Sequence, residues 1–140
     1  MEHISDILAD RMDNIPKILE NPMEFNETNT IRTCKELPDK TQQDIQVKRI
    51  METIYFYILK IWYTGDKILW KKEATEISNY VRDLREGAQR MDMTHLIDLE
   101  EHHLRNTQAN PHFLYMIEQV QEKTLQLLWQ NYHKEESNKN

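Results

Sequence analysis

The feature that most constrains this chain is a long apolar repeat that begins after Asn110 and Pro111. Its apolar-face positions recur at spacings of three and four residues: Phe113, Ile117, Val120, Thr124 and Leu127. That spacing places side chains on one face of a helix, and an asparagine followed by proline is a strong helix start. We therefore predict a long amphipathic helix over about 111–133, whose apolar face must be covered by other segments.

The small number of turn residues points to an all-α fold. The chain has 140 residues but only two glycines and four prolines, whereas a sheet fold of this size needs many turns. No internal repeat or low-complexity linker divides the sequence. We predict a single compact helical bundle of about five to seven helices over 1–133, followed by a polar tail over 134–140 that should fray.

A second core helix is predicted over about 40–72, capped by Asp39 and continuous through Gly65. Its inward face is marked by Val47, Ile50, Ile54, Tyr57, Ile61 and Ile68. The middle of this segment is apolar nearly all round, which is typical of a helix buried on several sides. The residues that we expect to be most buried in the two long helices are Ile54, Ile58, Ile61, Ile117, Val120 and Leu127.

Shorter helices are predicted around this pair. Apolar spacing indicates helices over 4–12, from Ile15 to about Asn21, around Cys34, and along a stripe from Ile77 to Met91. The stretch 22–30 has turn formers and no helical period, so it is expected to be a loop. Pro38 is expected to end the helix around Cys34. The chain is expected to turn at 91–93, and Thr94 is expected to cap the helix that carries Leu96, Leu99 and His103.

Charge and cysteine content narrow the class of protein. The formal net charge is -6, which argues against a domain that binds nucleic acid through bulk electrostatics and favours protein partners or self-association. Cys34 is the only cysteine, so no internal disulfide is expected, and a reducing, cytoplasmic setting is indicated. The N-terminal residues lack a secretory pattern, and the apolar run 54–63 is far shorter than the ~20 residues that span a membrane, so no membrane role is expected.

Motifs for cofactors and metals are sparse. Gly65 and Gly87 are too far apart to build a phosphate-binding loop, so no nucleotide cofactor is expected. Glu100 and His103 give one Glu-x-x-His spacing, whereas helical di-metal sites need two such pairs with further carboxylates. We therefore expect no metal, and interpret this run as a solvated acidic face with His103 partly buried.

One pair of residues resembles a catalytic motif. Arg90 and His95 are spaced as in the Arg-x4-His motif of the HEPN family, helical proteins that include ribonucleases. The pair falls across the predicted turn at 91–93, and the alternative is two surface residues. We expect no catalytic residue and keep a HEPN-like ribonuclease or toxin as an alternative.

Two tryptophans are predicted to face a partner. Trp70 and Trp129 lie beside charged residues and outside the main apolar stripes, and large aromatic anchors dominate interface energetics. Trp70 is close to Lys67, Lys71 and Lys72, a combination that could stack on a nucleic-acid base. We favour a simpler interpretation, in which these lysines sit near a helix C-terminus where the helix dipole favours positive charge.

The segments from residue 56 onward resemble the C-terminal domain of the delta-prime subunit of the bacterial DNA polymerase III clamp loader. The stretch Ile61-Trp62-Tyr63-Thr64-Gly65-Asp66 followed by Lys67-Ile68-Leu69 is similar to the family's Leu-x-x-Trp-x-Arg-Asp-x-Leu. The run from Leu99 through Asn106 and Asn110 to Glu118 is similar to its Leu-x-x-Asn-x-Asn-x-x-Leu-x-x-Glu. Gly65 and Pro111 depart from the family pattern.

This resemblance implies a collar domain without catalytic residues. In that family the collar domains of neighbouring subunits pack side by side into a ring that holds the clamp loader together. The resemblance therefore implies a helical assembly domain for DNA replication, either as part of a longer subunit or as a free-standing relative. A small helical adaptor unrelated to replication is the other non-enzymatic alternative.

Overall fold

The computed structural model describes residues 4–20, 27–90, 92–105 and 110–138. These ranges contain only helices as regular structure, which confirms the all-α prediction. The helices are α1 (Ile4–Met12), α2 (Asn14–Glu20), α3 (Glu27–Glu36), α4 (Gln42–Tyr63), α5 (Lys67–Arg90), α6 (Met93–Leu104) and α7 (Pro111–Asn138). Among them, none combines the length and the apolar character that crossing a bilayer requires.

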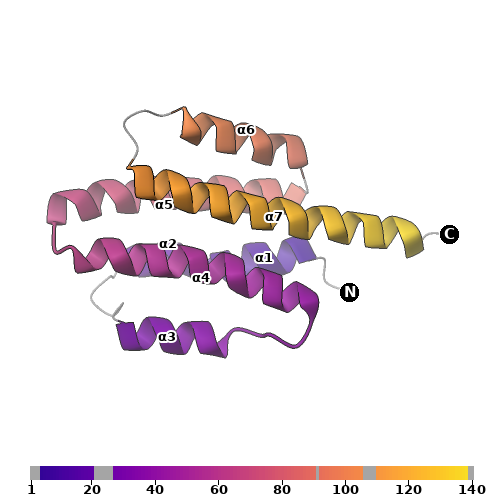
Figure 1. Cartoon of the computed structure of the whole chain (residues 1–140), viewed down its shortest axis with the longest axis horizontal. Helices are drawn as coiled ribbons and strands as arrows, with labels where there is room; N and C mark the ends of the chain where they lie inside the picture. Colours follow the sequence, from indigo (N-terminus) through magenta and orange to yellow (C-terminus); the bar gives the residue numbers. More distant parts are fainter. Residues whose placement is uncertain (1–3, 21–26, 91, 106–109, 139–140) are drawn as a thin grey trace.

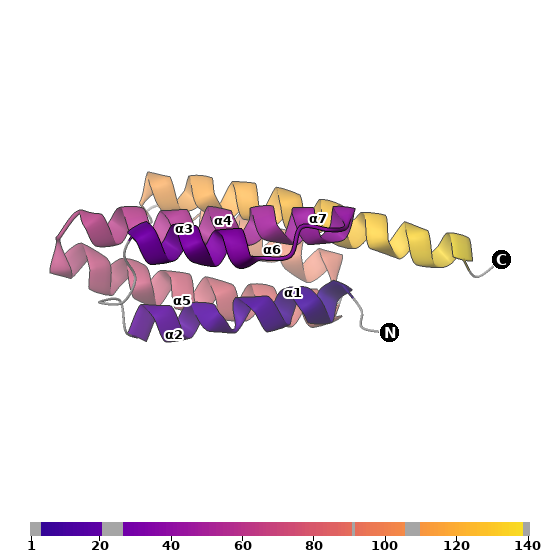
Figure 2. The ribbon, with the colours of Figure 1, turned by 90° about the horizontal axis from the view of Figure 1, so that it is seen from below.

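The three longest helices, α4, α5 and α7, lie side by side along the long axis of the molecule (Figures 1 and 2). The short helices α1 and α2 follow one another along α5, and α3 lies along α4. On the other side of the bundle α6 packs on α5 and α7 (Figure 1). Because α4 contacts α1, α3, α5 and α7, it is covered on several sides, as its composition predicts.

The core forms where the apolar stripes meet. All six residues that we expected to be most buried are at most 3 % exposed. The stripe of α5 is also confirmed at Ile77, Val81, Leu84 and Ala88, which are fully buried, while Met91 lies outside the described residues. Sequence periodicity therefore identifies the core faces of all three long helices.

The predicted continuous helix over 40–72 is wrong, because the chain turns sharply at Gly65. The Gly65 amide donates to the carbonyl of Trp62 at 3.2 Å, and the glycine adopts a φ of 72°, a left-handed conformation that residues with a Cβ rarely adopt. The Asp66 carboxylate then accepts from the amides of Ile68 and Leu69, each at 3.0 Å, and so caps α5. The expected two-helix core is therefore a core of three long helices.

Ile68 shows the consequence of that error. Its spacing from Ile61 continues the apolar period of α4, yet it belongs to α5 and is 85 % exposed. The prediction that Ile68 lies on an inward face is therefore wrong. The period of three and four residues holds only within one continuous helix.

Several helix boundaries differ from the predictions. The cap of α4 is Thr41 rather than Asp39, since its hydroxyl accepts from the Asp44 amide at 3.0 Å. The cap of α6 is Asp92 rather than Thr94. In both places another residue with a side-chain oxygen, close in sequence to the predicted cap, takes the capping position.

Other boundaries fall as follows. The expected loop 22–30 is wrong in its second part, because α3 begins at Glu27, and its first part lies outside the described residues. Asn110 caps α7 as predicted, accepting from the His112 amide at 3.0 Å. The helix then runs to Asn138, past the predicted end at 133, so the backbone of 134–138 is helical. Asn106 lies outside the described residues.

Candidate functional site

The turn between α4 and α5 extends past the neighbouring helices at one end of the bundle (Figures 1 and 2). We call this region the hairpin end and define it as Lys60, Trp62, Tyr63, Lys67, Ile68, Trp70, Lys71 and Lys72. It combines apolar rings and an aliphatic side chain with four lysines, in a chain that is acidic overall. It is the strongest candidate for a functional surface in the described part of the chain.

The apolar part of the hairpin end is only partly covered. Tyr63 is 62 % exposed and Ile68 is 85 % exposed. Trp62 and Trp70 are half-buried and contact each other edge to face, with ring centroids 5.0 Å apart and an interplanar angle of 71°. The tryptophan pair thus packs across the base of the hairpin, while Tyr63 and Ile68 remain exposed.

Three of the four lysines of the hairpin end contradict the helix-dipole interpretation. Lys67, Lys71 and Lys72 occupy the first two turns of α5 rather than the end of α4, and positive charge is unfavourable at a helix N-terminus. Together with Ile68 they line an open groove along this helix. Lys67 and Lys71 therefore gain nothing from the helix dipole, which is consistent with a role in binding, whereas Lys72 also interacts with the Glu76 carboxylate one turn later.

The two tryptophans predicted to face a partner lie on different elements. Trp70 is near the start of α5 and packs against the core, so it is less exposed than a surface anchor would be. Trp129 is 53 % exposed in the second half of α7. Their roles in binding a partner stay predictions.

Arg90 and His95 are separated by the break between α5 and α6. The guanidinium of Arg90, the last residue of α5, binds the Glu86 carboxylate one turn earlier. His95 follows the cap of α6, with its ring packed next to Gly87, and its Nε2 is buried without a hydrogen-bond partner among the described residues. In this arrangement Arg90 neutralises a neighbouring carboxylate, and His95 packs between α5 and α6.

The Glu-x-x-His run lies on α6 against α7. His103 packs edge to face on Tyr80, with centroids 5.3 Å apart and an interplanar angle of 89°. Burial lowers its pKa, and the neighbouring His102 lowers it further. Over residues 4–20, 27–90, 92–105 and 110–138, no group of three or more His, Cys, Asp or Glu side chains is arranged to hold a metal.

A buried polar contact that we did not predict joins α4 and α5. Glu73 is fully buried, and the Tyr57 hydroxyl donates to its Oε2 at 2.8 Å. Burial raises the pKa of the nearby Glu76, and repulsion from Glu73 raises it further. A sequence signal was present, because Glu73 lies four residues before Ile77 and therefore in line with the apolar stripe of α5.

A second buried polar contact holds α5, α6 and α7 together. The Tyr80 hydroxyl donates to Oε1 of Gln121 at 3.1 Å, and Nε2 of Gln121 donates to the carbonyl of Leu96. Both side chains are fully buried. These bonds link three helices through fully buried side chains, so we interpret the contact as structural.

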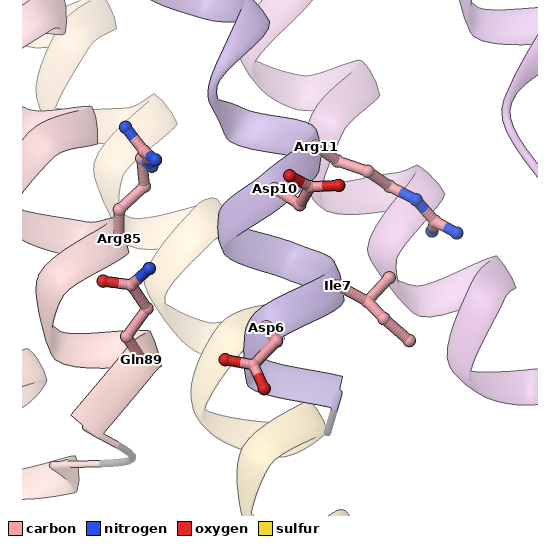
Figure 3. A pocket seen from close by; sticks show the side chains of 6 residues that line it. All are labelled: Asp6, Ile7, Asp10, Arg11, Arg85 and Gln89. Carbon is pink, nitrogen blue, oxygen red and sulfur yellow. The ribbon is translucent and has the colours of Figure 1, made fainter. Parts of the chain in front are cut away.

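A polar groove lies between α1 and α5 (Figure 3). It is lined by Asp6, Ile7, Asp10, Arg11, Arg85 and Gln89. Both arginines of the groove are engaged within the fold: Arg85 donates to the carbonyl of Ala9 at 3.1 Å and pairs with Asp13 at 3.2 Å. The Arg11 side chain points away from Arg85 (Figure 3) and pairs with Asp44 at 3.4 Å. The groove thus fastens α1 to the bundle.

Comparisons with protein families, with curated proteins and with solved structures gave no match.

Proposed function

We propose that this chain is a non-catalytic helical assembly domain that binds protein subunits through its surface. The observation that carries the proposal is the exposure of Tyr63 and Ile68 at the hairpin end. Exposed apolar side chains grouped at one projecting turn are typical of a protein interaction site. Aromatic residues in particular are enriched where protein surfaces meet.

The catalytic alternative has less support from the described geometry. A nuclease would need Arg90 and His95 to converge on a phosphate, but Arg90 is engaged by Glu86 and His95 packs against Gly87. The proposal therefore assigns no catalytic residue. It predicts that the pure protein does not cleave RNA, and that replacing Arg90 by alanine leaves partner binding unchanged.

We further propose that the partners are subunits of a bacterial replication clamp loader, acting in the cytoplasm. This finer proposal rests on the resemblance of residues 56–128 to the collar domain of the delta-prime subunit. The alternative partner is a protein unrelated to replication, for which the chain would act as a small helical adaptor. The exposed apolar side chains of the hairpin end are compatible with either partner, because they indicate a protein-binding surface and not which protein binds to it.

The test is a mixing experiment with purified clamp-loader subunits, read by size-exclusion chromatography and by a binding titration. The wild-type chain is expected to co-elute with a subunit, and Ile68→Ser and Trp129→Ala are each expected to weaken binding. Ile31→Ser, which removes a 39 % exposed isoleucine from α3, is the matched control. Wild-type chain that never co-elutes would reject the clamp-loader assignment, and variants that bind like wild type would reject these residues as contacts.

A further inference from the structure

A second partly exposed apolar surface lies on α6. Ile97 is 46 % exposed and Leu104 is 36 % exposed, and their spacing of seven residues places them on the same side of the helix. Asp98 and Glu101 are exposed between them. We call these four residues the α6 face.

The surroundings of the α6 face are strongly acidic. The pKa of Glu100 is raised by burial and then by repulsion from Glu118, Glu101 and Glu122, so carboxylates of α6 and α7 lie close enough to repel one another. Arg105 offsets this only weakly, because it meets Glu101 at 3.9 Å and both side chains are well exposed. An approaching surface with positive charge would relieve this repulsion.

The hairpin end has the complementary character. Its exposed apolar side chains, Tyr63 and Ile68, are accompanied by exposed lysines at 60, 67 and 71. Each surface therefore offers apolar contact area next to charge, and the two charges are opposite. Complementary charge steers association and suppresses wrong partners, while the apolar side chains supply contact area.

Within one chain the hairpin end and the α6 face lie on different parts of the molecule. The α4–α5 turn projects at one end of the molecule, whereas α6 lies along the side of the bundle, on α5 and α7 (Figure 1). We propose that the hairpin end of one chain docks on the α6 face of a second copy of the same chain. The inference rests on the proposed assembly function and names a partner for it.

Such a contact is heterologous, because each copy contributes a different surface. Heterologous contacts leave one surface of each kind free at the ends of the assembly, so copies add head to tail into chains or close into a ring. Association through this contact should weaken as salt screens the lysines from the carboxylates. It should also depend on protein concentration.

The first test is the mass of the purified chain in solution, measured by sedimentation over a range of concentrations. The mass of one chain is 17.0 kDa, and the weight-average mass is expected to rise above it with concentration and to fall back in high salt. Ile68→Ser and the double variant Ile97→Ser/Leu104→Ser are each expected to stay at the mass of one chain. Ile31→Ser, on α3 at the opposite side of the bundle from α6, should behave as wild type.

The decisive test mixes the two non-associating variants. The Ile68→Ser chain keeps its α6 face and the Ile97→Ser/Leu104→Ser chain keeps its hairpin end, so the mixture is expected to form a one-to-one pair of roughly twice the chain mass that grows no further. Circular dichroism of each variant confirms that it is folded before mixing. A symmetric contact between two hairpin ends would instead leave the α6 variant associating alone.

Other outcomes overturn the proposal. A wild-type chain that stays at the mass of one chain, or variants that fail to pair when mixed, would exclude docking on a second copy. Binding of a dT oligonucleotide or of vesicles rich in phosphatidylserine through Ile68, without self-association, would assign the hairpin end to those ligands. Rejection of self-association would not reject the proposed function, because a monomeric chain that co-elutes with a clamp-loader subunit would still be an assembly domain.

Discussion

The hydroxyl oxygen of Tyr57 on α4 lies 2.8 Å from Oε2 of Glu73 on α5, and both side chains are buried where these two helices meet. The tyrosine donates the hydrogen bond. Burial, followed by the contact with Glu73, holds the pKa of Tyr57 well above its usual range, so the hydroxyl remains a donor at any physiological pH. The other oxygen of Glu73, Oε1, has no hydrogen-bond partner among the described residues, so Glu73 depends on Tyr57.

Replacing Tyr57 by phenylalanine should therefore destabilise the fold. Among the described residues Tyr57 is the hydrogen-bond partner of the buried Glu73 side chain, and an unsatisfied buried polar group costs about 1–3 kcal/mol. The double variant Tyr57→Phe/Glu73→Leu should recover part of that loss, since both partners are then apolar. Urea unfolding at neutral pH measures both free energies, with Tyr63→Phe on the exposed surface as the control. A double variant less stable than Tyr57→Phe would contradict this interpretation.

Truncation of Ile117 tests the core of the bundle. Ile117 is fully buried on α7, and its change to alanine should lower the free energy of unfolding by about 2–5 kcal/mol, because it removes buried methyl groups and leaves a cavity. Ile68→Ala on the exposed hairpin end should change stability by no more than about 0.5 kcal/mol. Parallel denaturation curves provide the comparison, and equal losses at the two sites would show that the core is misassigned.

The core faces could be predicted from the sequence because burial follows helical period. Ile54, Ile58, Val120 and Leu127 were all placed correctly on that basis alone. The break at Gly65 was missed because apolar residues continue at helical spacing on both sides of it, so periodicity alone gave no sign of a turn. Its signal was local: a glycine able to take a positive φ, followed by Asp66 as a cap.

The candidate site was predicted less well, for a related reason. The sequence showed lysines near Trp70, but whether the helix dipole favours their charge depends on which end of a helix they occupy. The turn at Gly65 places them at the start of α5. The contact of Trp62 with Trp70 also exists only because the chain reverses there. Pairs that are far apart in sequence, such as Tyr80 and Gln121, require knowledge of how the helices pack.

The close approach of α5 and α6 at Gly87 gives a further prediction. A Cβ at this position would lie 2.7 Å from Cδ2 of Leu96 and 2.9 Å from Cδ2 of His95. Gly87→Ala should destabilise the protein by about 1–3 kcal/mol through overpacking, even though alanine is the better helix former. Adding Leu96→Ala would remove the nearest clash, so the two changes should cost less than the sum of their separate effects. Thermal unfolding of the four proteins in this cycle measures the difference, and simple additivity would argue against a steric contact.

Glu100 should make stability depend on pH. Its pKa in the folded state is raised above the usual value of 4.5 by burial and by neighbouring carboxylates, so the folded protein binds this proton more tightly than the unfolded chain. Stability from this group is fully present below pH 4.5 and is lost as pH rises through the raised pKa. Glu100→Gln should therefore gain stability relative to wild type as pH rises from 4 toward 7, by less than about 1 kcal/mol because the group is partly exposed. Urea midpoints across this range provide the measurement, and a constant offset between the two proteins would contradict it.

Trp70→Ala and Trp129→Ala should differ in how much each lowers the stability of the isolated chain. Trp70 packs edge to face on Trp62 and against the core, so Trp70→Ala should lose the aromatic contact, about 0.5–1.5 kcal/mol, in addition to its buried area. Trp129 is 53 % exposed, so Trp129→Ala should cost less in the isolated chain.

In a binding titration with a clamp-loader subunit, Trp129→Ala should weaken binding more than Trp70→Ala does if Trp129 is an anchor. An anchor at the centre of an interface costs about 2 kcal/mol or more when truncated, whereas Trp70 would act by supporting the hairpin end. Trp70→Phe is the matched control, because it keeps a ring against Trp62 and should preserve stability better than alanine. Equal loss of stability at the two tryptophans would contradict the packing difference, and unchanged binding by Trp129→Ala would remove Trp129 from the interface.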